Sequence, residues 1–384
     1  MQIRVLQLIK GLDIGNRNGG SDKFGLELAK ALKSLGIQVS LASLNRFDTR
    51  IEQDNLTLLR ELSIPVVFIE GKNTLFKLFS PQLAEYCRQY NINAINSHFQ
   101  VGTLMAIRTR RFGYRGKIIR TAHIDKEWGD GVCPWLLRQV FTKCIFPLQT
   151  DLQVGVSRNI VQTINSYPGT RLSNRMAKLV YNGILRNWFE PIPNKKYSNS
   201  PKKIIGAIGL LIERKGYDYL IGAMPKVLER FPESKLVIVG EGDYREVLKT
   251  QINRLKLSHN VELIGRQSDV RYWLEKMDLF VLPSLVEGLP TVIIESMARG
   301  VPVIASNIPG NDELVFNEET GWLADARSAN DLAAKILEAL DNPTKYEKIS
   351  SRAFTVVRDL TIDNAAMQYA ALYSSLLDVK VQAQ

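Results

Sequence analysis

The sequence lacks an apolar run long enough to cross a membrane as a helix. A spanning segment needs about 18 or more consecutive apolar residues, and none of the 384 residues begins such a run. The first ten residues, MQIRVLQLIK, are predicted to form a strand and not a secretory signal, because charged and polar residues interrupt their apolar stretch. We therefore expect a cytoplasmic protein that, where it meets a membrane, lies on the cytoplasmic face.

Cysteine and histidine are both scarce. The three cysteines are Cys87, Cys133 and Cys144. They show no metal-ligand spacing and do not make an even set for a disulfide framework, which agrees with a reducing compartment. Apolar content of 45% and charged content of 23% are ordinary for a globular chain. A chain of this length exceeds one ordinary hydrophobic core, so two domains are expected.

Negative charge is in short supply in the first half of the chain. Residues 1–200 contain 28 Lys/Arg and 14 Asp/Glu, a net +14, whereas residues 201–384 contain 22 and 25, a net −3, which together give +11. This asymmetry predicts an anionic partner for the first half, namely a membrane surface, a lipid phosphate or an acidic glycan. The densest basic cluster comprises Arg108, Arg110, Arg111, Arg115, Lys117 and Arg120. Phe112 and Tyr114 inside it also leave a nucleic-acid surface open, and a solvated basic face without a partner is the plainer alternative.

Short apolar segments alternate with helical patterns along the whole chain. Strands are predicted at residues 3–8, 39–42, 92–97, 117–122 and 152–156, then at 203–208, 236–239, 261–263, 279–282 and 303–305. Strands that alternate with helices predict parallel α/β sheets. A polar, proline-punctuated linker at 188–202 separates the two halves. We therefore predict two doubly wound, Rossmann-like domains facing a cleft, with ligands at the carboxyl ends of the strands.

The segment Glu287-Gly-Leu-Pro-Thr-Val-Ile-Ile-Glu295 carries the strongest chemical signal. It follows the apolar run 279–282 and precedes a helical pattern that ends at Gly300, so it is predicted to join a strand to a helix N-terminus. Such an N-terminus presents unpaired N–H groups and partial positive charge, which suit a phosphate. The two carboxylates can accept hydrogen bonds from sugar hydroxyls. A phosphate seat between hydroxyl acceptors indicates a nucleotide sugar.

A wider set of residues around this segment resembles a known family. The runs DLFVLPS at 278–284, Glu287-Gly288, ESMA at 295–298 and GVPVIA at 300–305 resemble the donor-site signature of retaining GT-B glycosyltransferases of family 4. The resemblance implies an acceptor-binding domain at 1–187, the linker at 188–202 and a nucleotide-sugar-binding domain at 203–355. It also implies that the last segment, 356–384, crosses back to the first domain as a helix.

The resemblance assigns donor-binding roles in the second domain. Glu295 would bind the ribose hydroxyls, Glu287 would contact the donor sugar, and Lys215 would hold the donor phosphates. The remaining donor-loop positions are Gly288, Leu289, Pro290 and Thr291, where N–H groups would face the phosphate. One departure is Leu210, where the family usually has an arginine, and Arg214 is expected to substitute from the other end of the same loop. The loops Gly240–Gly242 and Gly265–Gln267 would border the base.

The first domain supplies fewer matches. Gly19 and Gly20 resemble the family's first loop, where glycine lets the backbone approach a ligand closely. His123 follows a predicted strand, and the resemblance implies that it lies near the transferred sugar. His98 follows the neighbouring strand in the same way and is a second candidate. Either Asp125 or Glu127 could orient or deprotonate an acceptor hydroxyl.

These observations predict a retaining glycosyltransferase that moves a sugar from a nucleotide sugar to a glycan or lipid-linked acceptor. No D-x-D metal motif is present, and this fold seldom needs a metal, so neither a metal nor another cofactor is expected. Cell-surface polysaccharide, lipopolysaccharide or glycolipid synthesis is the expected setting. Two alternatives remain open, a nucleotide-sugar 2-epimerase on the same fold and a non-catalytic partner subunit that Leu210 would explain.

Overall fold

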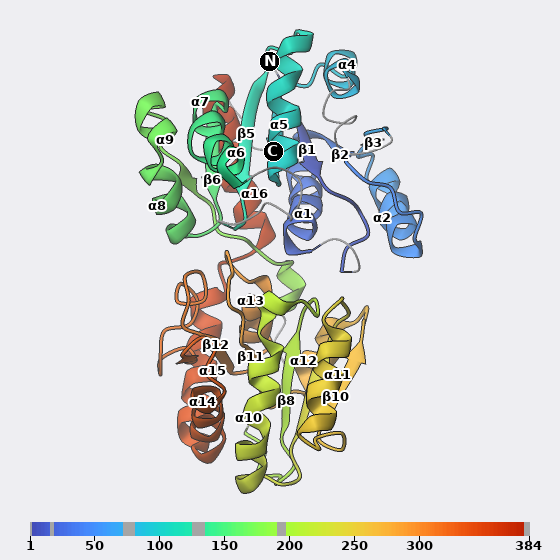
Figure 1. Cartoon of the computed structure of the whole chain (residues 1–384). Helices are drawn as coiled ribbons and strands as arrows, with labels where there is room; N and C mark the ends of the chain where they lie inside the picture. Colours follow the sequence, from blue (N-terminus) through green and yellow to red (C-terminus); the bar gives the residue numbers. More distant parts are fainter. Residues whose placement is uncertain (1, 16–18, 72–80, 125–134, 190–196, 380–384) are drawn as a thin grey trace. The chain divides into compact units, whose positions relative to one another are not determined.

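The chain divides into two compact units, each built around one parallel sheet (Figure 1). The computed structural model describes residues 2–15, 19–71, 81–124, 135–189 and 197–379. The N-terminal unit comprises residues 1–185 with 361–384, and the C-terminal unit comprises residues 186–360. Asp125, Glu127 and the middle of the predicted linker lie outside the described residues.

The sheet of the N-terminal unit has the order β3-β2-β1-β4-β5-β6-β7, with every pair parallel. Its strands are β1 (Arg4–Ile9), β2 (Gln38–Ser43), β3 (Val66–Phe68), β4 (Ala94–Ser97), β5 (Lys117–Ala122), β6 (Leu152–Gly155) and β7 (Lys178–Leu179). The order reverses between β1 and β4, so the loops after these two strands diverge and leave a crevice at their carboxyl ends. Residues after β1, β4 and β5 are therefore placed where ligands bind in such sheets.

Helices connect these strands. They are α1 (Gly20–Ser34), α2 (Arg50–Glu61), α4 (Gln82–Gln89), α5 (Gln100–Thr109), η1 (Arg110–Phe112), α6 (Trp135–Val140), the π-helical η2 (Phe141–Ile145), α7 (Phe146–Gln149), α8 (Arg158–Ser166), α9 (Pro168–Ser173) and α16 (Ile362–Leu377). The last of these, α16, packs on α1 and buries Tyr369 and Tyr373 in the core of the N-terminal unit. No helix within the described residues is both long enough and apolar enough to cross a membrane.

The sheet of the C-terminal unit repeats the same winding in the order β10-β9-β8-β11-β12-β13. Its strands are β8 (Ile204–Ile208), β9 (Lys235–Val239), β10 (Val261–Gly265), β11 (Leu279–Leu282), β12 (Val303–Ser306) and β13 (Trp322–Ala324). Its helices are η3 (Arg186–Phe189), η4 (Glu213–Lys215), α10 (Tyr217–Arg230), α11 (Arg245–Arg254), α12 (Val270–Lys276), α13 (Thr291–Ala298), α14 (Ala329–Asp341) and α15 (Pro343–Val357). The reversal lies between β8 and β11, the strands that precede the two predicted donor loops.

The prediction of two doubly wound Rossmann-like domains is confirmed. The strands that sequence periodicity missed are β3, β7 and β13, which are two or three residues long and lie toward the ends of the sheets. Segments this short contain too few alternations to be separated from loops by pattern alone.

Candidate functional site

The C-terminal unit brings two predicted donor loops into direct contact. Lys215 ends η4 in the loop after β8, and its Nζ lies 2.5 Å from Oε1 of Glu287 in the loop after β11. The side chains are largely buried, with 13% and 9% of their surfaces exposed. The Ser284 hydroxyl donates to the same Oε1 at 2.7 Å. Oε1 is therefore occupied by two donors, whereas Oε2 has no hydrogen bond within the described residues and is left for a ligand.

The backbone fixes these loops against each other. Gly216 has a left-handed φ of 64°, and a Cβ at this position would lie 2.2 Å from the Pro283 carbonyl oxygen. Leu285 N–H donates to the Arg214 carbonyl at 2.8 Å, and the Arg214 guanidinium reaches the Val286 carbonyl at 3.4 Å. Arg214 therefore lies beside the loop that carries Glu287. A residue that replaces the family's usual arginine, absent at Leu210, would need this position.

The helix that follows Glu287 begins without a side-chain cap. Pro290 is the N-cap residue, one position before the first helical residue, Thr291. The ψ of Pro290 is 109°, which is extended, so the proline precedes the helix and does not interrupt its hydrogen bonds. An uncapped helix start leaves first-turn N–H groups to a ligand. Gly288 and Leu289 are buried in the loop, and Glu295 is buried on the second turn of α13, with 3% of its surface exposed.

Tyr217 belongs to this site and was missed from the sequence. Its side chain is fully buried, and its hydroxyl has no hydrogen-bond partner among the residues that the structure describes. A Cβ built on Gly209 would lie 2.8 Å from that hydroxyl and 3.7 Å from Cε of Lys215. Burial raises the pKa of Tyr217, and the charge of Glu287 raises it further, so the hydroxyl stays a donor. From the sequence, a tyrosine at the start of an amphipathic helix is predicted to be a core residue. The unsatisfied hydroxyl oxygen, which only the structure reveals, indicates a role in the site.

The loops after β9 and β10 are packed on the loop after β8 by direct backbone contact. A Cβ on Gly240 would lie 1.9 Å from the Gly209 carbonyl oxygen, and one on Gly242 would lie 2.3 Å from that of Leu211. Gly240 N–H donates to the Gly265 carbonyl at 3.0 Å. The glycines therefore let three strand ends meet closely, and whether these loops border a base stays a prediction.

In the N-terminal unit two histidines form a pair at the carboxyl ends of β4 and β5. Nδ1 of His98 lies 3.0 Å from Nε2 of His123, and Nε2 of His98 lies 2.8 Å from Oε1 of Gln7. Phe24 of α1 contacts both imidazole rings. Burial lowers the pKa of His98 to about 3. Burial, and then the charges of His98, Lys10 and Arg120, hold the pKa of His123 well below its usual value, so both rings are neutral at pH 7.

The C-terminal helix settles where the protons of this pair lie. Gln7 Nε2 and Asn96 Nδ2 both donate to the Tyr373 hydroxyl, at 3.2 and 3.0 Å. That orientation turns Gln7 Oε1 toward His98, so His98 Nε2 carries a proton and its Nδ1 does not. His123 must then donate from Nε2 to His98, which leaves the lone pair of the His123 ring on Nδ1. His123 is thus arranged to accept a hydrogen bond.

The two glycines of the first loop are less constrained than expected. Gly19 is the N-cap of α1, and Gly20 is its first residue. Neither has a left-handed φ, and a Cβ on either would meet nothing within 4 Å. The fold therefore does not require glycine here. Gly25 was not predicted, yet a Cβ there would lie 2.6 Å from Ile9 Cγ2 and 3.1 Å from His98 Cδ2, so it is needed to seat α1 on the histidine.

In the basic cluster of the first half, Arg120 is buried and the other five members are partly or fully exposed. Arg120 is buried in β5, where it donates to Gln153 and lies over the Phe146 ring. Arg110 pairs with Asp151 at 2.7 Å. Arg108 is half-buried and Arg111 is exposed. The alternation of β5 and the packing of α5 therefore distribute the cluster between core and surface.

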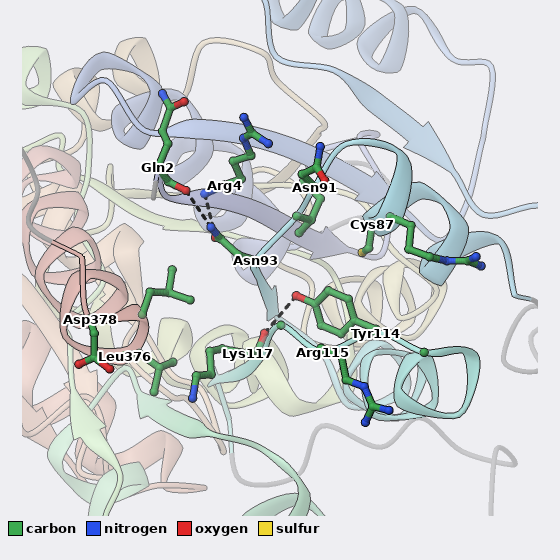
Figure 2. A pocket seen from close by; sticks show the side chains of 15 residues that line it. Gln2, Arg4, Cys87, Asn91, Asn93, Tyr114, Arg115, Lys117, Leu376 and Asp378 are labelled. Atoms are coloured by element: carbon green, nitrogen blue, oxygen red, sulfur yellow. Dashed lines mark hydrogen bonds between the residues drawn. The ribbon is translucent and has the colours of Figure 1, made fainter.

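Arg115 and Lys117 line a pocket of about 800 Å³ at the amino ends of β1 and β5, the edge of the sheet opposite to the histidine pair. Figure 2 shows the side chains of Arg4 and Arg115 pointing away from each other across this pocket. Arg4 is also engaged, because its Nε donates to Gln38 Oε1 at 2.8 Å. The cations do not converge on one point, so this hollow is not a seat for a single anion.

Comparison with known families covers most of the chain. Residues 18–185 match the family model described as Glycosyltransferase Family 4, and residues 189–356 match the one described as Glycosyl transferases group 1. The two matched ranges abut near residue 187, close to the boundary between the two units.

Similar proteins point the same way. The chain is 31% identical over 228 residues to the Vi polysaccharide biosynthesis protein VipC/TviE of Salmonella typhi, a match that covers 55% of this chain and 39% of that protein. It is 32% identical over 176 residues to the UDP-Gal:alpha-D-GlcNAc-diphosphoundecaprenol alpha-1,3-galactosyltransferase of Escherichia coli, covering 43% of this chain and 45% of the other. These matches therefore span less than half of each relative.

A solved structure matches over nearly the whole chain. The fold superposes on the Anabaena protein Alr3699/HepE, crystallised in complex with UDP, with a TM-score of 0.77. The match has 20% sequence identity and covers 97% of this chain and all of the other. At this identity the likeness establishes the GT-B fold and not a shared substrate.

Proposed function

Since the chain belongs to the GT-B glycosyltransferases of group 1 and family 4, we propose that it transfers a sugar from a nucleotide-diphosphate donor to an acceptor hydroxyl. The observation that carries the proposal is the Lys215–Glu287 pair beside the uncapped start of α13. A cation and free N–H groups on one side, and a carboxylate oxygen on the other, suit the two ends of a sugar diphosphate.

The proposed reaction breaks the bond between the anomeric carbon and the diphosphate oxygen, and a new bond forms from that carbon to the acceptor oxygen. Negative charge develops on the departing phosphate. Lys215, Arg214 and the N–H groups at the start of α13 would stabilise it. Glu287 would bind the donor sugar through Oε2. The negative charge of this carboxylate would also stabilise the positive charge that develops on the sugar ring. Glu295 would accept hydrogen bonds from the ribose.

His123 has a separate part in the proposal. Its contact with the transferred sugar is implied by the family resemblance, and the tautomer set by His98 supports it, because a neutral ring with its lone pair on Nδ1 can accept from a sugar hydroxyl. The proton of the acceptor hydroxyl would pass to the departing diphosphate. A histidine ring whose pKa is held low would orient that hydroxyl better than it would remove its proton.

We further propose that the acceptor is a lipid-linked or anionic glycan in cell-surface polysaccharide or glycolipid synthesis. The names of the Salmonella and Escherichia coli relatives, which refer to a polysaccharide and to a diphosphoundecaprenol acceptor, support this class. The excess of basic residues in the first 200 residues supports an anionic partner as well. Retention of anomeric configuration and independence of metal ions complete the proposal. The comparisons do not favour the 2-epimerase or the non-catalytic subunit, and Leu210 is the sequence feature that the second of these would explain.

Thermal-shift measurements with UDP-, GDP- and ADP-sugars and the free diphosphates test the donor site. A ligand that binds only the folded state raises the melting temperature by mass action, so one nucleotide series should give a shift. Glu295→Gln, which keeps the shape of the buried side chain, should lose the shift without unfolding. The proposal fails if no nucleotide stabilises the wild-type protein. Product anomer by NMR and activity in EDTA then test retention and metal independence.

A further inference from the structure

The most exposed large apolar side chains of the described residues belong to α6 and α9 of the N-terminal unit. Leu172, Trp135 and Leu136 are 77%, 71% and 66% exposed, and no other large apolar side chain within the described ranges exceeds them. Leu137 and Val140 of α6 and Leu148 of α7 are exposed as well. These six residues define what we call the α6–α9 face. A cluster of this size on a soluble surface indicates a binding partner.

Helices α6, η2 and α7 follow one another directly along the chain, and α9 packs on the last two. Helix α9 contacts both η2 and α7. A Cβ on Gly169 of α9 would lie 2.6 Å from the Cys144 carbonyl oxygen, so the two backbones are in close contact. Arg175 also donates to the Thr150 carbonyl at 2.8 Å. On α6, Leu136, Leu137 and Val140 share one side of the helix, because positions i, i+1 and i+4 fall within about 100°.

Charge among the described residues around the α6–α9 face is mostly positive. Within the N-terminal unit, residues 135–185 contain six Lys/Arg and one carboxylate, Asp151, a net +5. That carboxylate is already paired with Arg110. Lys143, Arg171 and Lys178 are exposed within the same stretch. Exposed apolar side chains with basic neighbours and almost no acidic ones are the pattern of a surface that lies in the headgroup region of an anionic bilayer.

We infer that the α6–α9 face binds the surface of an anionic lipid bilayer. Trp135, Leu136 and Leu172 enter the boundary between headgroups and acyl chains, where tryptophan is favoured. Lys143 and Arg171 contact lipid phosphates. A second copy of the chain fits this face less well, because a symmetric pair would bring two basic surfaces together, with Asp151 as the one carboxylate of residues 135–185.

This inference rests on the proposed function only for the biological purpose of membrane binding, which would keep the protein beside a lipid-linked acceptor. Its test needs no transfer activity. Purified protein is sedimented with vesicles of phosphatidylcholine alone, and with vesicles of phosphatidylcholine and phosphatidylglycerol. We expect binding to the anionic vesicles, weakened by added salt because surface charges are screened.

Two double variants separate the apolar and the charged contributions. Trp135→Ser with Leu136→Ser should lower the vesicle partition coefficient by about tenfold or more. Lys143→Gln with Arg171→Gln should lower it by about fivefold per charge, and only on anionic vesicles. The matched control is Val247→Ser with Tyr272→Ser, two exposed apolar residues of the C-terminal unit, which should leave binding unchanged. Melting temperatures of all variants show that they are folded.

Three results would overturn the inference. The first is no vesicle binding by the wild-type protein, and the second is binding that both double variants retain in full. The third is a concentration-dependent dimer in sedimentation velocity that Trp135→Ser with Leu136→Ser abolishes, which would assign the face to a second copy. A protein that binds vesicles but no nucleotide would contradict the proposed function and leave this inference standing.

Discussion

Nε2 of His123 lies 3.0 Å from Nδ1 of His98, and the Gln7 oxygen that faces the other ring nitrogen of His98 indicates that His123 is the donor. The chain of bonds runs from Tyr373 through Gln7 to His98 and then to His123. A second branch joins Tyr373 to Asn96, then to Thr121 and Tyr369. All members except His123 are buried. Because every donor in such a network needs a matching acceptor, the histidine pair has one neutral arrangement, and protonation of either ring disrupts it.

The pH dependence of stability should report this pair. Both histidines have folded-state pKa values below 6.5, His98 at about 3. Between pH 6.5 and the folded values, the unfolded chain binds protons that the folded chain does not, so stability falls as pH decreases. We expect the free energy of unfolding of the N-terminal unit to drop by about 1.4 kcal/mol per pH unit for each histidine below pH 6.5.

Denaturant melts at pH 7.0 to 5.0, above the main titration of carboxylates, measure this slope. His98→Gln should give a shallower slope than the wild-type protein. The control is His259→Gln, which removes the exposed histidine of the C-terminal unit and should leave the slope of the N-terminal unit as it is. Equal slopes for all three proteins would show that the pair is not held neutral.

The Lys215–Glu287 pair should show strong coupling in a double-mutant cycle. Lys215→Met leaves a largely buried carboxylate without its cation, which costs about 3 kcal/mol of unfolding free energy. Lys215→Met with Glu287→Gln removes both charges and should recover part of that loss. Nucleotide-sugar turnover should be lost in every variant that lacks Lys215. Additive effects on stability, or normal turnover without Lys215, would contradict the roles assigned here.

The fold could be predicted largely from the sequence, because strand and helix periodicities differ and both units follow one alternation. The two predicted donor loops were recognised by their resemblance to the family signature, and the structure places Lys215 and Glu287 after the two strands at which the order of the sheet reverses. Their donor-binding role stays a prediction. What the sequence does not contain is the distance between loops that are 72 residues apart. Their 2.5 Å contact depends on the backbone approach of Gly216 to Pro283.

The histidine pair and the basic cluster show two ways in which a sequence pattern fails to predict which residues lie together. His98 and His123 both follow strands, but only the parallel pairing of Ser97 with Arg120 places them side by side. Without the register, His98 reads as an ordinary core residue. The basic cluster is contiguous in sequence, yet the period of two in β5 and the packing of α5 divide it between core and surface. The exposed layer from α6 to α9 has no periodic signature, because its elements are short.

Substitutions of glycine should separate ligand contact from folding. Gly20→Ala adds a methyl group in open space at the first position of α1, so stability should be unchanged or raised by about 0.5–1 kcal/mol. If the backbone there approaches a ligand, turnover should nevertheless fall. Gly25→Ala instead presses on Ile9 and His98 and should cost about 1–3 kcal/mol. Melting temperatures and steady-state kinetics of the two variants decide the matter, and full activity of Gly20→Ala would remove the loop from the donor site.

Tyr217→Phe should stabilise the ligand-free protein and weaken its binding of a nucleotide sugar. The Tyr217 hydroxyl is buried without a partner, and an unsatisfied buried donor costs about 1–3 kcal/mol. Phenylalanine keeps the packing of the ring in the core of the C-terminal unit and removes that cost. If the hydroxyl instead donates to the donor diphosphate above Gly209, the same change removes a charge-assisted hydrogen bond from the complex. The melting temperature without ligand should therefore rise while the dissociation constant of the donor increases by about tenfold. A variant that is less stable and binds the donor normally would show that a buried water, and not the ligand, satisfies Tyr217.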